Sequence, residues 1–134
     1  MIDIKEQLIR HEGLNLSMYR CPADKWSIGV GHNLEDRPIS KRAAMMILED
    51  DIDVARRDLY RLIPEYADMP EPVAIVLINL CFNMGAPRLA GFKKMLAAIR
   101  ARHWSLAADE LMDSRYAEQV GDRAVELAGI LRSA

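Results

Sequence analysis

The sequence lacks a long apolar run, a leader segment and more than a few cysteines. No stretch approaches the roughly 18 apolar residues that cross a bilayer, and the first six residues show no basic segment followed by an apolar one, as a signal peptide would. Cys21 and Cys81 are the two cysteines, and neither pairs with a histidine in a metal-binding pattern. We therefore expect a single cytoplasmic domain with no metal and no cofactor. The sequence does not exclude a disulfide between the two cysteines, but cytoplasmic thiols are usually kept reduced.

An excess of positive charge is also missing. The 134 residues carry a net charge of -2, and the pI is near 5.9. Proteins that bind nucleic acid usually show a basic stripe, so the composition disfavours that class. It also lacks the overall positive charge that would steer the chain to an anionic polymer. The hydrophobic fraction of 51% and the charged fraction of 28% are ordinary for a globular protein.

Helix signals cover most of the chain. Asp3 is a suitable N-cap for a first helix that ends before Gly13, and Ser40 can cap a long helix that reaches about Leu62. The prolines at 70 and 72 begin a helix that is apolar almost all round, which predicts burial on every side. Gly85 ends it. Three shorter helices are expected at 93–102, 105–113 and 122–131.

One short segment has the period of a β-strand instead. From Trp26 to Gly31, bulky apolar residues alternate with a serine and two glycines. Glycine inside a strand often marks close approach by a ligand or another backbone. A β-bulge or tight packing explains the same pattern and is favoured on this feature alone.

Several polar residues occupy positions where a polar or charged side chain is destabilising unless it has a partner. Glu12 ends the first helix, where the helix dipole disfavours a carboxylate, so it is a candidate general acid or a solvated surface residue. Asp51 lies on the apolar face of the long helix and needs a partner there. Asn79 and Asn83 lie one turn apart on the apolar helix, where they either cap backbone groups or face a ligand.

Two motifs near the N-terminus occur at a defined spacing. HEGLNLSMY begins at His11, and WSIGVGH begins at Trp26. Eight residues separate Glu12 from Cys21, and five separate Cys21 from Ser27. In this, the chain resembles the phage-type lysozymes, glycoside hydrolase family 24. The resemblance continues through INLCFNMG at 78–85, AGF at 90–92, Trp104, SRY at 114–116 and QVGDRA at 119–124.

This resemblance implies a fold and an activity. The fold would be α+β and mainly helical, lysozyme-like, in one domain over residues 1–134. A small hairpin lobe at about 14–50 would be joined by a long helix to a helical lobe formed by 1–13 and 51–134. The activity would be that of an endolysin, which hydrolyses the β-1,4 bond between N-acetylmuramic acid and N-acetylglucosamine in peptidoglycan.

The resemblance also assigns roles to individual residues. Glu12 would be the general acid, which glycoside hydrolysis requires at the leaving oxygen. Cys21 would stabilise the developing cation, position water or attack carbon, and Ser27 would hold the attacking water. Arg123 would pair with Glu12, and His32 would form a structural ion pair with Asp51. The substrate-binding residues would be Gly29, Gly31, Asn79 and Asn83.

Three departures from the family pattern keep alternatives open. Cys21 stands where many members have aspartate, Ser27 replaces threonine, and the segment between His32 and Asp51 is shorter than in the longest members. The neighbouring Arg20 and Lys25 would favour a Cys21 thiolate if they lie close, but Cys21 could also be only a small residue that supports the turn. A lytic transglycosylase, which cleaves the same bond without water, and a non-catalytic peptidoglycan-binding module are the alternative functions.

The resemblance also implies partners and a compartment. An endolysin without a leader would remain in the host cytoplasm and act in the periplasm after the inner membrane is permeabilised, so a holin is required functionally. We expect a monomer that binds glycan strands, without nucleic acid and without stable membrane insertion.

Overall fold

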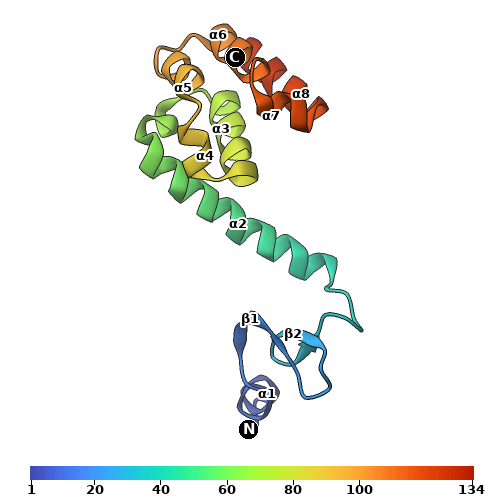
Figure 1. Ribbon diagram of the computed structural model, residues 1–134. Coiled ribbons are helices and arrows are strands. Elements are labelled where there is room, and N and C mark those ends of the chain that lie inside the picture. Colours follow the sequence, from blue (N-terminus) through green and yellow to red (C-terminus); the bar gives the residue numbers. More distant parts are fainter. The chain divides into compact units, whose positions relative to one another are not determined.

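The computed structural model describes residues 1–134 and contains two compact units, Met1–Met46 and Ile47–Ala134. The first contains α1 (Ile4–Glu12), β1 (Asn15–Arg20), β2 (Trp26–Gly29) and β3 (His32–Asn33). Helix α2 (Lys41–Leu62) continues along the chain from the first unit into the second (Figure 1). The second unit adds η1 (Pro64–Asp68), α3 (Glu71–Met84), α4 (Ala86–Ala90), α5 (Lys93–Arg100), α6 (Trp104–Met112), α7 (Arg115–Val120) and α8 (Asp122–Arg132).

This element order confirms the expected α+β, mainly helical fold with a small β element near the N-terminus. The long helix expected after Ser40 is also present. The finer division, in which 1–13 joins 51–134 in one lobe, stays a prediction. None of the helices is both long enough and apolar enough to cross a membrane.

The helix ends follow the capping residues of the sequence. The Asp3 carboxylate accepts a hydrogen bond from the backbone N–H of Lys5 at 2.9 Å, and the Ser40 hydroxyl accepts one from the N–H of Ala43 at 3.0 Å. Gly13 and Gly85 end α1 and α3 with φ angles of 78° and 83°. Only glycine adopts this region without steric cost, which is why both helices end there.

The three strands form an antiparallel sheet in the order β1-β2-β3. Ser27 lies opposite Tyr19 on one side and Asn33 on the other. The strand expected to reach Gly31 ends at Gly29, so that expectation was too long. The physical reason is the backbone, because Gly29 and Gly31 have φ angles of 69° and 67° and form a turn.

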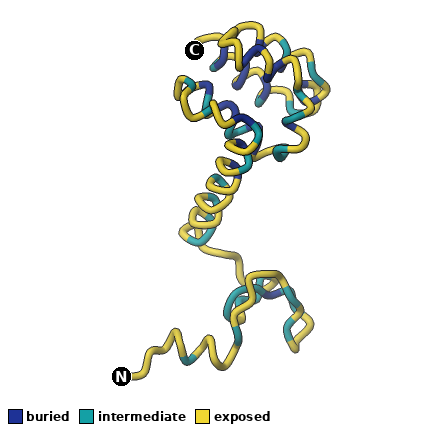
Figure 2. Tube along the Cα trace, turned by 90° about the vertical axis from the view of Figure 1, so that its left-hand side faces the viewer, coloured by how far each residue is buried: buried dark blue, intermediate teal, exposed yellow.

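The hydrophobic core lies in the second unit and surrounds α3. Helix α8 packs against α3, α6 and α7, and α6 packs against α5. Figure 2 shows the buried residues concentrated in these helices. The largest fully buried side chains are Leu59, Ile63, Val73, Val76, Leu77, Leu80, Leu89, Met95, Ile99, Leu111 and Leu131.

The helical expectations need three corrections. Helix α3 is not buried on every side, since Ile75 and Phe82 are 48% and 44% exposed and line a surface pocket. The helix expected at 93–102 ends at Arg100, and Arg102 takes a positive φ of 59°. Helices α4 and α7 and the turn η1 were not expected. The start of α7 is explained by Ser114, whose hydroxyl accepts a hydrogen bond from the N–H of Ala117 at 3.1 Å.

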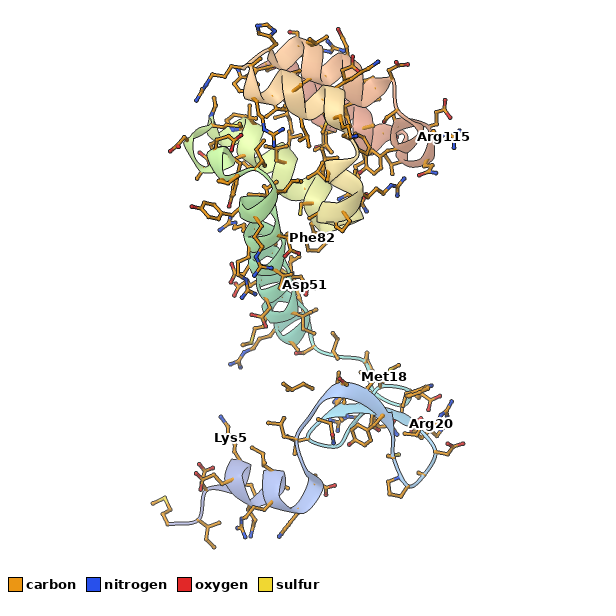
Figure 3. The ribbon with its side chains drawn as sticks, turned by 60° about the vertical axis from the view of Figure 1, so that its left-hand side comes forward. Lys5, Met18, Arg20, Asp51, Phe82 and Arg115 are labelled. Atoms are coloured by element: carbon orange, nitrogen blue, oxygen red, sulfur yellow. The ribbon has the colours of Figure 1, made fainter.

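The first unit has no comparable apolar core. No residue of α1 is buried, and Ser27 is the buried residue of the β element. The apolar side chains of Leu16 and Met18 on β1 are 86% and 54% exposed. Figure 3 shows Met18 and Arg20 on this strand. The geometry of this unit therefore depends on hydrogen bonds and glycine turns rather than on apolar burial.

The core of the second unit leads to a stability prediction on α6. Leu111 is fully buried, whereas Leu106 on the same helix is 47% exposed. Replacing Leu111 by alanine should lower the free energy of unfolding by about 2–5 kcal/mol, because a cavity remains. The matched variant Leu106→Ala should cost about 1 kcal/mol or less. Urea unfolding of both variants measures the difference, and equal losses would contradict the packing of α6.

Candidate functional site

Glu12 is the last residue of α1 and is exposed to solvent. Gly13 ends the helix, and Asn15 then pairs with Gly29 of β2. A Cβ atom at Gly31 would lie 3.4 Å from Oε2 of Glu12 and 3.7 Å from its Cβ. A Cβ at Gly31 would therefore make ordinary van der Waals contact with the Glu12 side chain, while a Cβ at Gly29 would meet nothing within 4 Å. Gly31 borders the Glu12 carboxylate, and its φ of 67° is what favours glycine at this position.

Cys21 begins the turn that joins β1 to β2. Its N–H donates to the carbonyl of Lys25 at 2.9 Å, and its own carbonyl accepts from the N–H of Asp24 at 2.8 Å. Cys21 is half-buried and its thiol is free. The backbone amide of Lys25 lowers the pKa of this thiol; partial desolvation opposes it, and the amide of Ala23 and the Ser27 hydroxyl lower it further.

The two cations beside Cys21 are directed elsewhere. The Arg20 guanidinium lies 4.3 Å from the centroid of the Trp26 ring and 3.4 Å from a carboxylate oxygen of Asp24. The Lys25 ammonium lies 3.5 Å from Oδ1 of Asp36. The expectation that Arg20 and Lys25 would favour the thiolate depended on their lying close to it, and the charge of neither is among the causes that lower the Cys21 pKa. Hydrogen bonds from the turn, and not these cations, lower the Cys21 pKa.

Ser27 is the buried polar residue of the sheet, only 1% exposed. Its hydroxyl donates to the carbonyl of Lys25 at 3.3 Å, and the same hydroxyl is among the groups that lower the pKa of the Cys21 thiol. The structure therefore brings Cys21 and Ser27 together. Their sequence separation alone could not show this, because it depends on the register that places Arg20 opposite Trp26.

The loop after β3 supplies residues that sequence reasoning missed. A carboxylate oxygen of Glu35 accepts from the N–H of Trp26 at 2.8 Å. The side-chain oxygen of Asn33 accepts from the N–H groups of Glu35 and Asp36 at 3.0 and 3.1 Å. An asparagine that bonds the backbone two residues on is a readable turn signal, whereas nothing in the sequence connects Glu35 to Trp26. These bonds fix the start of β2.

The histidine expected in an ion pair has a partner within the first unit. The Nε2 atom of His32 lies 3.1 Å from the carbonyl oxygen of Arg37. Asp51 lies in the second unit, where it is an exposed residue of α2 (Figure 3). The two residues belong to different units, so their pairing stays a prediction.

The second unit joins two of the expected site residues. The side-chain oxygen of Asn79 accepts from Nε and Nη2 of Arg123 at 3.0 and 2.7 Å. Both residues line a pocket of about 360 Å3 together with Leu48, Ile52, Arg56, Ile75, Ile78 and Phe82. The pairing of Arg123 with Glu12 stays a prediction, since the two lie in different units. Asn83 accepts instead from the Tyr116 hydroxyl at 2.8 Å.

The comparison with known proteins identifies the family of the chain. Residues 9–132 match the family model described as phage lysozyme. The chain belongs to the phage lysozyme family. It is 24% identical to probable T4-type lysozyme 1 and 25% identical to probable T4-type lysozyme 2, both of Dictyostelium discoideum, over 97% of this chain and 94% of each relative. It is also 25% identical to the pre-baseplate central spike protein Gp5 of Enterobacteria phage T4, over 97% of this chain and 28% of that protein.

The alignments also show a difference in length. They extend over 158 to 160 positions, more than the 134 residues of this chain, so these relatives contain insertions. This chain therefore forms both the hairpin unit, Met1–Met46, and the helical unit, Ile47–Ala134, without those insertions.

The hydrogen bonds at Cys21 predict how its reactivity depends on pH. The alkylation rate of a thiol follows its thiolate fraction, so the midpoint for Cys21 should lie below the ordinary value of about 8.5. Ser27→Ala removes one hydrogen bond that lowers the pKa and should move the midpoint upward. Ser17→Ala, on the exposed strand β1, should not.

Cys81 does not interfere with this measurement. It is buried, and burial, with a smaller effect of the Asp58 carboxylate, raises its pKa. The rate of reaction with iodoacetamide, measured against pH for the two serine variants, therefore reports Cys21. An unchanged midpoint in Ser27→Ala would contradict the contact between Ser27 and Cys21.

Proposed function

We propose that this protein is an endolysin that hydrolyses the β-1,4 bond between N-acetylmuramic acid and N-acetylglucosamine, with Glu12 as the general acid. The observation that carries the proposal is the position of Glu12 at the end of α1, exposed to solvent and beside the Cβ-free surface of Gly31. A proton donor to the leaving oxygen must be reachable by the substrate. Membership of the phage lysozyme family supports a glycosidase acting on peptidoglycan.

Cys21 and Ser27 supply the second half of the reaction in this proposal. Glycoside hydrolysis passes through an oxocarbenium-like transition state, which a nearby anion stabilises. The hydrogen bonds around the Cys21 thiol lower its pKa, so they increase the thiolate fraction at a given pH. Ser27 retains the hydroxyl that would hold the attacking water.

Other residues would bind the substrate or support the acid. The substrate-binding residues in this proposal are Gly29, Gly31, Asn79 and Asn83. Arg123 would orient Glu12 through its guanidinium group, which Asn79 already fixes by two hydrogen bonds. His32 and Asp51 would form a structural ion pair.

A lytic transglycosylase remains the second candidate for the chemistry. The departure at Cys21 favours it, because that reaction needs no second carboxylate. Mass spectrometry of digested peptidoglycan distinguishes the two reactions, since hydrolysis leaves a free reducing sugar and transglycosylation a 1,6-anhydro sugar. A non-catalytic module would release neither product. Dependence on a holin, action in the periplasm and a monomeric state are further parts of the proposal.

The first functional prediction concerns the acid. Glu12→Gln keeps the shape of the side chain but cannot donate the proton, so the rate on purified peptidoglycan should fall at least about 100-fold. The matched variant Glu6→Gln, an exposed glutamate of the same helix, should keep the wild-type rate. Turbidity clearing of chloroform-treated Gram-negative cells measures both. Full activity in Glu12→Gln would remove this residue from the mechanism.

The second functional prediction concerns position 21. Alanine and serine carry no charge there, so Cys21→Ala and Cys21→Ser should each lose most of the activity. Cys21→Asp should retain a large share, because a carboxylate can accept from the same groups that surround the thiol: the amides of Lys25 and Ala23 and the Ser27 hydroxyl. A small thiol reagent should inactivate the wild type but not Cys21→Asp.

The outcome of this series decides the role of the thiol. Turnover on purified peptidoglycan is measured for all three variants alongside the wild type. Near-normal turnover in Cys21→Ala would show that position 21 only supports the turn before Pro22.

A further inference from the structure

A second pocket of the helical unit has a strongly cationic lining. Its volume is about 530 Å3, and it lies beside the first turn of α5 and the start of α7. Arg88, Lys93, Lys94 and Arg115 line it, and Glu110 is the one carboxylate among the lining residues. The side chains of Lys93, Lys94 and Arg115 form no ion pair. In Figure 3 the Arg115 side chain extends away from α7.

This concentration of positive charge is not explained by composition or by helix stability. The whole chain has a net charge of -2. Lys93 and Lys94 occupy the first turn of α5, whose N-cap residue Phe92 makes no capping hydrogen bond. The helix dipole is positive at this end and disfavours cations there. The lysines therefore repel each other and the dipole, and a bound anion would offset that repulsion.

The wall of the pocket combines these cations with two aromatic rings. Phe92 and Tyr116 meet edge to face, with ring centroids 6.2 Å apart and planes at 81°. Tyr116 is held by its hydrogen bond to Asn83. The Arg88 guanidinium lies 5.8 Å from the Tyr116 centroid and donates to the side-chain oxygen of Gln119 at 2.9 Å. Arg88 therefore has a defined orientation, and the half-buried Phe92 ring supplies apolar surface for the ring of a ligand, whereas Tyr116 is only 2% exposed.

We propose that this pocket binds the phosphate group of a phosphorylated saccharide. Four cations against one carboxylate leave a lining charge of +3, which exceeds the single charge of a carboxylate ligand. A phosphate monoester carries nearly two charges and three acceptor oxygens, and the guanidinium groups of Arg88 and Arg115 match that geometry. The half-buried Phe92 ring then contacts the sugar. This binding site needs none of the chemistry proposed for Glu12.

The test uses binding and not activity. N-acetylglucosamine 1-phosphate is titrated into the full-length protein and followed by two-dimensional NMR, with inorganic phosphate, N-acetylglucosamine and N-acetylmuramyl-L-alanyl-D-isoglutamine as separate probes. Shifts should concentrate in Gly91–Met95 and Ser114–Tyr116. Lys93→Gln/Lys94→Gln removes two of the four lining cations, so it should weaken binding of the sugar phosphate about tenfold or more. The matched double variant Lys5→Gln/Lys41→Gln removes the same charge elsewhere and should bind normally.

The other probes test whether binding requires both the phosphate and the sugar, and the salt concentration tests whether binding depends on charge. Support requires that, judged by the shifts of Gly91–Met95 and Ser114–Tyr116, N-acetylglucosamine 1-phosphate binds more tightly than inorganic phosphate and than the carboxylate-bearing muramyl peptide, and that N-acetylglucosamine shifts none of these residues. Raising the NaCl concentration should weaken binding, because salt screens exposed charges. Equal affinity in the two double variants would overturn the proposal, and so would preference for the muramyl peptide, or binding of the uncharged sugar, at Gly91–Met95 and Ser114–Tyr116.

Discussion

The burial of α3 is the constraint on which the helical unit depends. Val73, Leu77 and Leu80 are fully buried, and helices packed around them must match their surface. That burial fixes the rotation of the helix, and with it the direction of the polar exceptions Asn79 and Asn83. Asn79 then meets Arg123 of α8, and Asn83 meets the Tyr116 hydroxyl of α7. Polar groups on an apolar helix need such partners, so the same packing stabilises the unit and positions its site residues.

The hairpin unit obeys a different constraint, because it has almost no apolar burial. Its geometry depends on the hydrogen bond that Ser27 donates and on those that the side chains of Asn33 and Glu35 accept. It depends also on the positive φ angles of Gly29 and Gly31. Hydrogen bonds in such exposed positions contribute modestly to stability, but they are directional. A unit of this kind can fix the orientation of a few side chains without a large core. Gly31 lies beside the Glu12 carboxylate that we propose as the general acid, and its positive φ favours glycine at this position.

Local signals in the sequence predicted the parts of the fold that local physics controls. The caps at Asp3, Ser40, Gly13 and Gly85 fixed helix ends, and the alternation from Trp26 indicated the strand. The contacts that depend on register or tertiary packing could not be predicted from these signals. The bond from Trp26 to Glu35 joins residues nine positions apart across β2 and β3, and that from Arg123 to Asn79 joins residues 44 positions apart on two helices. The resemblance named candidate site residues, but their hydrogen-bond partners depend on tertiary structure and could not be predicted from the sequence.

The surroundings of Cys21 bear on the proposal that a thiolate takes the place of the aspartate found in many family members. The largest contribution to its lowered pKa comes from the backbone amide of Lys25, and those of Ala23 and the Ser27 hydroxyl add to it. Donors of this kind stabilise any anion placed in the turn, because they recognise charge and lone pairs and not a particular side chain. Arg20 and Lys25, whose charges are directed to Asp24 and Asp36, are not needed for this effect. A turn that supplies its own donors can therefore exchange aspartate for cysteine and retain an anion, provided that the thiol ionises.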